Sequence, residues 1–125
     1  MSSYYEKFLA TGEVKCIDEE IPFEIPQGWE WSRMGSIGDW GAGATPAKGN
    51  TSYYGGNILW LRTGELNNSI VNDTEIKITD KALKECSLRL NKAGDVLIAM
   101  YGATIGKVAI AGCELTTNQA CCEIG

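Results

Sequence analysis

Short apolar runs separated by glycine-containing turns form the main pattern in the second half of the chain. Residues 58–62, ILWLR, are rich in strand-forming residues and are bounded by turn residues, so they predict a buried strand. A shorter run at 76–79 predicts another strand. The later runs predict successive strands divided by glycine turns, at residues 88–90 (LRL), 92–100 (KAGDVLIAM), 107–111 (KVAIA) and 120–125 (ACCEIG).

Helical spacing occurs at two places. Ser3 and Glu6 stand at capping-box spacing in SYYEKFLA, which predicts a short N-terminal helix. Residues 79–86, TDKALKEC, combine an N-cap at Thr79 or Asp80 with apolar residues at helical spacing, which predicts a helix of one to two turns. Because strands outnumber helices, we expect an α+β fold with a mainly antiparallel, partly barrel-like sheet and a few short helices.

Two long segments follow neither period. Residues 11–31 contain two prolines, two glycines and an acidic run, and we expect an extended segment anchored by the packing of Trp29 and Trp31. Residues 38–57 are rich in Gly, Thr, Ser and Asn, with aromatic residues interleaved. A loop of this length tends to be functional or disordered, and the aromatic residues favour order. We therefore expect an ordered surface loop.

The length and composition of the chain are those of one soluble domain. The chain has 125 residues, of which 44% are hydrophobic and 22% are charged. No apolar run approaches the roughly 18 residues of a membrane span. The N-terminus lacks the basic start and apolar stretch of a secretory signal, so we expect a cytoplasmic protein without membrane association.

The chain has five cysteines and no histidine, and this limits its chemistry. The cysteines include no CxxC pair and match no usual zinc spacing, so reduced thiols are expected. Without histidine, Ser-His-Asp and Cys-His catalysis are excluded. No Asp-x-Asp pattern supports a metal site for cleavage. We expect no catalytic residues, no metal and no cofactor.

Charge is distributed unevenly along the chain. The net charge is −5, and residues 1–30 hold seven acidic residues against two lysines. The remainder carries equal numbers of acidic and basic residues. Nucleic-acid binding is driven by clustered Lys and Arg, and a neutral body can still present a local basic surface. The sequence predicts an acidic leader over residues 1–20, which includes the N-terminal helix, and a domain over residues 21–125.

The stretch AMYGATIGKVAIAG, residues 99–112, has the glycines and lysine of a phosphate-binding loop but not their spacing. Only three residues separate Gly102 from Gly106, and Val108 stands where a P-loop has Ser or Thr. The following KVAIA favours a strand over a helix. The stretch therefore predicts two strands joined by a glycine-shaped turn, with Thr104 and Lys107 on the outside.

Three further patterns leave a binding and a structural interpretation open. GAGATP at 41–46 is not a dinucleotide fingerprint, because a proline replaces the third glycine. Asn118 and Gln119 are amides that can pair with adenine or tie down local backbone. The basic residues nearest the glycine-rich turns can approach phosphate or be solvated surface charge; they are Lys48, Arg62 and Lys107.

Four motifs occur in series from about residue 21 to the end. They are IPFEIPQGWEWSRMGSIGDW, GATPAKGNTSYYGGNILWLRTGEL, ITDKALKECSLRLNKAGDVLIAMYGATIGKVAI and TTNQACCEIG. In this order and spacing, they resemble the target-recognition domain of a type I restriction-modification specificity (S) subunit. The resemblance implies sequence-specific recognition of double-stranded DNA, without catalysis by the subunit itself. It also implies partnership with the modification (methyltransferase) and restriction (translocase and nuclease) subunits.

The family motifs map onto four groups of positions in this chain. The ATP and YYGG motifs map onto Thr45, Pro46 and residues 53–56, the strand and turn motif onto Trp60 and residues 64–66, and the last two motifs onto residues 102–107 and 117–120. In the family these motifs resemble scaffold, and variable loops between them contact the bases. The residues that we expect near DNA are therefore Thr45, Lys48, Asn50, Thr51, Arg62, Thr63, Asn67, Asn68, Tyr101, Thr104 and Lys107.

The chain departs from the family in length. A full S subunit carries two recognition domains and long spacer helices, whereas this sequence holds one truncated recognition domain. We therefore expect an excised fragment, a truncated gene product or a half-subunit. Two alternatives remain open at this point: a protein-interaction or assembly module without a DNA role, and the recognition portion of a fused restriction-methyltransferase enzyme.

Overall fold

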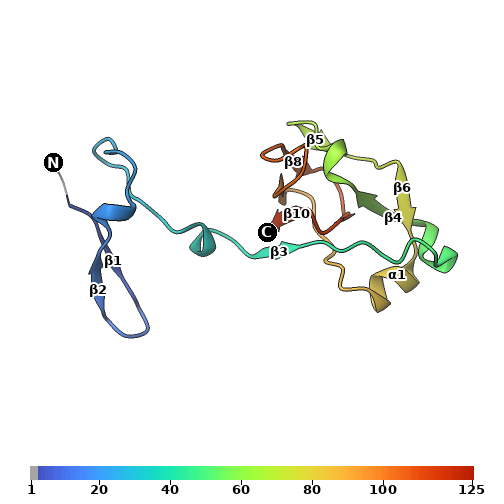
Figure 1. The fold of residues 1–125 in the computed structure, drawn as a ribbon, viewed down its shortest axis with the longest axis horizontal. Coiled ribbons are helices and arrows are strands. Elements are labelled where there is room, and N and C mark those ends of the chain that lie inside the picture. The colour runs from blue at the N-terminus through green and yellow to red at the C-terminus, as the bar shows by residue number, and fades with distance from the viewer. Residues whose placement is uncertain (1–2) are drawn as a thin grey trace. The chain divides into compact units, whose positions relative to one another are not determined.

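The chain divides into two units, Met1–Ser32 and Arg33–Gly125, and the second contains most of the strands and the α-helix (Figure 1). The computed structural model describes residues 3–125. No helix among these residues is long and apolar enough to cross a membrane.

The first unit is built on a β-hairpin. Strand β1 (Tyr5–Lys7) pairs antiparallel with β2 (Val14–Cys16). Gly12, at φ +74°, closes the turn by donating its N–H to the carbonyl of Phe8 at 2.7 Å. The helix predicted here is wrong. An isolated helix of two turns is marginal in water, whereas the hairpin pairs its backbone across the turn.

The rest of the first unit is largely exposed. The short 3-10 helix η1 (Asp18–Glu20) follows β2, and the Asp18 carboxylate accepts the N–H of Tyr4 at 2.6 Å, which lowers the pKa of Asp18. Trp31 packs against Phe23 with ring centroids 5.2 Å apart, as its expected anchoring role requires. Trp29 is 71% exposed, so the prediction that it is an anchor is wrong.

The second unit contains a five-stranded sheet of order β3-β10-β7-β8-β5. All neighbouring pairs are antiparallel except β5 and β8, which are parallel. The strands are β3 (Trp40–Ala42), β5 (Ile70–Val71), β7 (Val96–Ala99), β8 (Val108–Ala111) and β10 (Cys121–Ile124).

A three-stranded sheet of order β6-β4-β9 is formed by strands that are interleaved in sequence with those of the five-stranded sheet, and Leu61 of β4 packs in the same apolar cluster. Strand β4 (Tyr54–Leu61) pairs antiparallel with β6 (Ile76–Ile78) and parallel with β9 (Thr116–Thr117). Helix α1 (Asp80–Glu85) follows β6. The 3-10 helices of this unit are η2 (Met34–Ser36), η3 (Thr51–Tyr53) and η4 (Thr63–Glu65).

Two apolar clusters hold the second unit together. The larger joins the two sheets through Leu61 of β4, Leu97 of β7 and Cys121 of β10, all fully buried. The smaller lies under α1 and contains Trp60, Ile78 and Ala82. The indole N–H of Trp60 donates to the carbonyl of Ala44 at 3.0 Å, so this ring also fixes the segment before η3.

The expected fold class agrees with the structure in its main features. The sheets are mainly antiparallel with few short helices, and the strands at 58–62, 76–79, 107–111 and within 92–100 and 120–125 are confirmed. The helix at 79–86 is also confirmed, with the Thr79 side chain accepting the Ala82 N–H at 3.3 Å.

Three details of the expected fold are wrong. Within residues 3–125 the strands form three separate sheets rather than a barrel. Residues 88–90 form no strand, since only the next residue, Asn91, makes an isolated bridge with Leu115. The expected loop at 38–57 contains β3, η3 and the start of β4, because its aromatic residues and Asn50 cap and pack regular elements.

Candidate functional site

Segments far apart in the sequence meet around the turn formed by residues 117–120. The Asn118 N–H donates to the carbonyl of Leu61 at 3.0 Å, and the Met100 N–H donates to the carbonyl of Ala120 at 2.8 Å. The Ala44 N–H donates to the carbonyl of Thr117 at 3.0 Å. We call the segments 43–46, 61–68, 99–108 and 117–120 the motif junction, because they carry four of the motifs identified in the sequence.

The approach at Gly43 is too close for any side chain. A Cβ added there would lie 2.1 Å from the carbonyl oxygen of Thr117 and 2.3 Å from its hydroxyl. Thr45, two residues further on, donates its hydroxyl to the side-chain oxygen of Gln119. The glycine therefore allows the 43–46 segment to lie directly on the 117–120 turn, and Thr45 to reach it with its side chain.

The loop between β7 and β8 is a tightly bonded tip. Gly102 and Gly106 adopt positive φ, +90° and +85°. The Gly106 N–H donates to Ala99 at 3.0 Å, and the Lys107 N–H donates to Thr104 at 3.0 Å. The expected hairpin connection is confirmed, and its glycines serve the backbone geometry of the turn.

Three of the expected DNA-proximal side chains project from this tip without a partner. Within residues 3–125, the side chains of Tyr101, Thr104 and Lys107 form no hydrogen bond or ion pair, and Tyr101 is 52% exposed. Thr63, at the start of η4, is likewise unbonded through its hydroxyl. These groups keep their full hydrogen-bonding capacity for a ligand.

The amides of Asn67 and Asn68 are used within the fold. The Asn67 side chain accepts the Ser69 N–H at 3.0 Å, and that of Asn68 accepts the Val108 N–H at 3.3 Å. Asn68 is in the left-handed region, at φ +56°, and its own N–H donates to Val108 at 2.9 Å. Asn68 therefore fastens the 61–68 segment to the base of the hairpin tip, whereas Asn67 bonds within its own loop, to Ser69 and Ile70.

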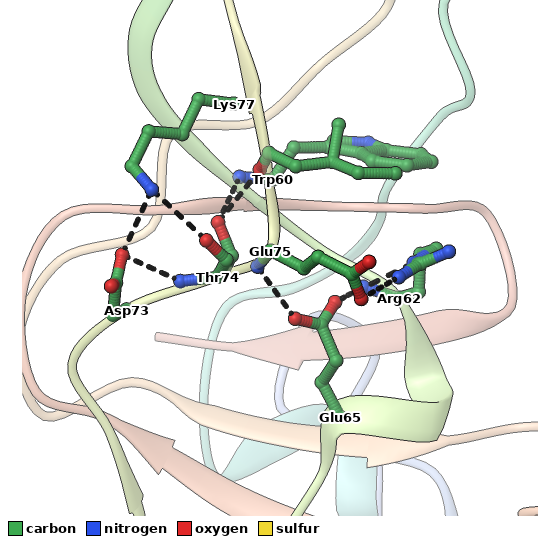
Figure 2. A network of polar contacts seen from close by, with 8 residues as sticks. Trp60, Arg62, Glu65, Asp73, Thr74, Glu75 and Lys77 are labelled. Carbon is green, nitrogen blue, oxygen red and sulfur yellow. Dashed lines mark hydrogen bonds and ion pairs between the residues drawn. The ribbon is translucent and has the colours of Figure 1, made fainter.

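Arg62 lies between two carboxylates, as Figure 2 shows. Its guanidinium is 2.7 Å from Glu75 Oε2 and its Nε is 3.7 Å from Glu65 Oε2. Glu65 also accepts two backbone N–H groups, those of Arg62 and Glu75, each at 2.9 Å. The Glu65 carboxylate thus closes the segment between β4 and β6 at its two ends. Sequence reasoning missed this role, because Glu75 lies outside every motif.

The same network continues toward β6 (Figure 2). Lys77 forms an ion pair with Asp73 at 3.1 Å and donates to the carbonyl of Thr74 at 3.0 Å. The hydrogen bond and charge of Lys77 lower the pKa of the Asp73 carboxyl. The buried Thr74 hydroxyl accepts the backbone N–H of Trp60 at 3.2 Å, which links the network to the core.

Asn50 and Thr51 belong to η3 and its cap, which lie at a separate corner beside α1, and Lys48 comes two residues before Asn50 in the chain. Asn50 caps η3 by accepting the Ser52 N–H at 3.0 Å, and Thr79 donates its hydroxyl to the carbonyl of Ser52 at 2.7 Å. In Figure 1, η3 and α1 lie together at one end of the second unit, and β5 and β8 lie at the other. The structure therefore divides the expected residues between two places.

A buried carboxylate lies under the motif junction. Glu123 is fully buried, accepts the Thr117 hydroxyl through Oε1, and has its Oε2 3.9 Å from Nε of Arg89. Burial raises the pKa of the neighbouring Cys121 thiol to about 11. Within the part of the chain that the structure describes, no cluster of His, Cys, Asp and Glu is arranged to hold a metal ion.

The chain belongs to the type I restriction modification DNA specificity domain family, whose model matches residues 26–125. Similar proteins include the MjaIX specificity subunit of Methanocaldococcus jannaschii, 40% identical over 99 residues, or 77% of this chain. The EcoR124I/EcoR124II specificity subunit of Escherichia coli is 30% identical over 94 residues, or 72% of this chain. The chain spans 23% of the length of each of these two relatives.

A solved structure has the same fold. Its title is "Structural basis underlying complex assembly and conformational transition of the type I R-M system", and the match has a TM-score of 0.63 at 20% identity. It covers 82% of this chain and 24% of that one. The resemblance stated from the sequence motifs is thereby confirmed at the level of family.

Proposed function

We propose that this chain recognises a DNA sequence on behalf of a type I restriction-modification complex, as the specificity component. The family assignment supports this, since the matched relatives are specificity subunits of type I restriction enzymes. In this proposal the chain is non-catalytic, requires no cofactor and acts in the cytoplasm. Its partners are double-stranded DNA and, in the longer protein, the modification and restriction subunits.

One observation carries the proposal: unbonded polar side chains gather where the motif junction fixes the backbone. Tyr101, Thr104 and Lys107 stand on a tip whose backbone is internally bonded, and Thr63 projects from the adjoining segment. Protein–DNA recognition needs cationic groups for phosphate and hydrogen-bonding groups for base edges, both held in register. A bonded scaffold that presents free donors satisfies both needs.

The expected contact residues take two roles in this proposal. Those with free side chains touch DNA directly, and those with bonded side chains shape the loops that do so. The direct group is Thr63, Tyr101, Thr104 and Lys107, with Thr51 at the corner beside α1 and Lys48 shortly before it in the chain; the shaping group is Thr45, Asn50, Arg62, Asn67 and Asn68.

Lys107 gives the sharpest test, because Lys92 provides a matched control. Lys92 is also exposed, and it precedes β7 at the other end of the same hairpin. The affinity of the chain for a fluorescent DNA duplex is measured by anisotropy over a series of salt concentrations. One phosphate contact contributes about 0.9 to the slope of log K against log salt. Lys107→Ala therefore lowers the slope by about this amount, and Lys92→Ala leaves it unchanged.

Two results contradict the proposal. Wild-type affinity that does not change with salt rules out phosphate binding of this kind. Equal effects of Lys107→Ala and Lys92→Ala show that the hairpin tip has no special place in binding.

A further inference from the structure

The tip between β7 and β8 exposes several large apolar side chains. Ile105 is 67% exposed and Tyr101 is 52% exposed, while Met100 and Val108 are 39% and 40% exposed. Isoleucine, valine and methionine are among the residues that folded proteins bury most often. Single exposed apolar side chains are normal, whereas a group of them at one place marks a surface for interaction. The tip therefore presents a small apolar surface that the fold of this chain leaves open.

The most exposed of these side chains stands on a fixed backbone. The Ile105 N–H donates to the carbonyl of Gly102 at 3.2 Å, and the N–H of the next residue, Gly106, donates to the carbonyl of Ala99 at 3.0 Å. Isoleucine is branched at Cβ, so few side-chain rotamers are open to it. A side chain held in this way loses little conformational entropy when a ligand covers it. Ile105 is therefore preorganised for insertion into a ligand.

The charge and the size of the tip favour DNA over a protein as that ligand. No acidic residue occurs between Asp95 and Glu114. Within residues 3–125, the Lys107 side chain forms no hydrogen bond or ion pair, so the tip complements a polyanion. A stable protein interface takes about 20 to 30 residues on each side, far more than this tip offers. A base step, by contrast, accepts a single apolar side chain, as in proteins that bend DNA.

We propose that Ile105 is a wedge that enters the stack between two neighbouring base pairs of the bound duplex, while Lys107 binds the adjacent phosphate. This inference rests on the proposed function. Insertion unstacks one base step and bends the duplex, and pyrimidine–purine steps deform most easily. A wedge makes no hydrogen bond to a base edge. This agrees with the place of Ile105 in one of the family motifs, residues 102–107, rather than in a variable loop.

The test uses the full 125-residue chain and a duplex that the wild type selects from a pool with a randomised central stretch. The fluorescence of 2-aminopurine, placed at successive positions of this duplex, increases where a base step is unstacked. A donor and an acceptor dye at the two ends report bending. We expect the wild type to raise the fluorescence at one step and to bring the ends closer together. Ile105→Ala should abolish both signals and weaken binding by about 10-fold, because the buried apolar contact is lost.

Two further variants control for side-chain chemistry and for position. Ile105→Leu keeps an apolar side chain of the same size and should keep both signals. Ile37→Ala removes an isoleucine that is 61% exposed elsewhere in the second unit, and should behave as the wild type. The slope of log K against log salt should be the same for Ile105→Ala as for the wild type, because Lys107 still binds phosphate. The urea midpoint of unfolding should also stay unchanged, because the side chain is exposed.

Three outcomes overturn the inference. Unchanged signals and affinity with Ile105→Ala remove the wedge and assign the apolar tip to a protein partner. Equal binding of the wild type and Ile105→Ala to a duplex with uracil in place of thymine assigns Ile105 to a thymine methyl group in the major groove. Both of these leave the proposed function standing. Failure of the wild type to select any duplex overturns the proposed function and this inference together.

Discussion

The Arg89–Glu123 pair gives a stability prediction that depends on the fold alone. Glu123 has no exposed surface and lies on β10, directly opposite Gly41 of β3. A Cβ at Gly41 would lie 2.8 Å from a guanidinium nitrogen of Arg89, so the arginine passes over this glycine to reach the carboxylate. Arg89 also donates to the carbonyl of Asp39 at 3.0 Å. Arg89→Ala therefore leaves a buried carboxylate with one hydrogen bond, from Thr117.

Removing one partner of a buried ion pair costs about 3 to 5 kcal/mol. The 3.9 Å separation and the 24% exposure of the Arg89 side chain place this pair at the lower end, at about 3 kcal/mol. With a urea m-value of about 1.5 kcal/mol/M, the midpoint of unfolding falls by about 2 M. The assay is urea unfolding followed by tryptophan fluorescence, to which the buried Trp60 responds.

Two variants decide whether the buried charge is the cause. Glu123→Gln removes the charge, so in the Arg89→Ala background it should restore most of the lost stability. Arg89→Lys keeps a cation and should fall between the wild type and Arg89→Ala. The reasoning is refuted if the double variant is as unstable as Arg89→Ala, or if Arg89→Ala costs less than about 1 kcal/mol.

Two further predictions concern α1 and the core thiol. Thr79→Ala removes the cap of α1 and the hydrogen bond to Ser52, and should lower the free energy of unfolding by about 1 kcal/mol. Thr79→Ser keeps the hydroxyl and should keep the wild-type stability. Equal urea midpoints for the two variants would contradict this prediction. Cys121, with its pKa raised to about 11 by burial, should resist alkylation at pH 8 while the exposed Cys16 reacts, as read by peptide mass spectrometry. Because the unfolded thiol ionises first as pH rises from its ordinary pKa of 9.0 toward 11, the stability of the fold should decrease over that range. Labelling of Cys121 at the rate of Cys16 would contradict the assignment.

The local pattern of apolar, turn and capping residues was sufficient to predict those elements whose defining residues lie within one segment of the chain. Strand β4 follows an apolar run between turns, and α1 follows its Thr79 cap. The helix prediction for the N-terminal segment was wrong because the decisive signal is not local. The segment forms a hairpin in which Tyr5 pairs with Cys16, eleven residues away. The strand predicted at residues 88–90 was wrong because the Arg89 side chain pairs with the buried Glu123 and the backbone there has no neighbouring strand to pair with.

The motifs indicated which segments matter but not how their side chains are used. The pairing of Thr45 with Gln119 spans 74 residues, and that of Asn68 with Val108 spans 40. Such pairs depend on how the sheets pack, and no local spacing encodes them. Sequence reasoning therefore grouped Arg62 and Lys107 together as basic residues near turns, whereas the fold neutralises the first with Glu65 and Glu75 and leaves the second free.

This division between bonded and unbonded side chains bears on how a new target sequence could arise. Replacing Thr104 or Lys107 breaks no side-chain bond within residues 3–125, so the thermodynamic cost of such changes is small. Replacing Asn68 or Glu65 removes bonds that hold a loop to its neighbour. Under the proposed function, selection can therefore explore new specificities at the hairpin tip while the frame that presents it stays folded.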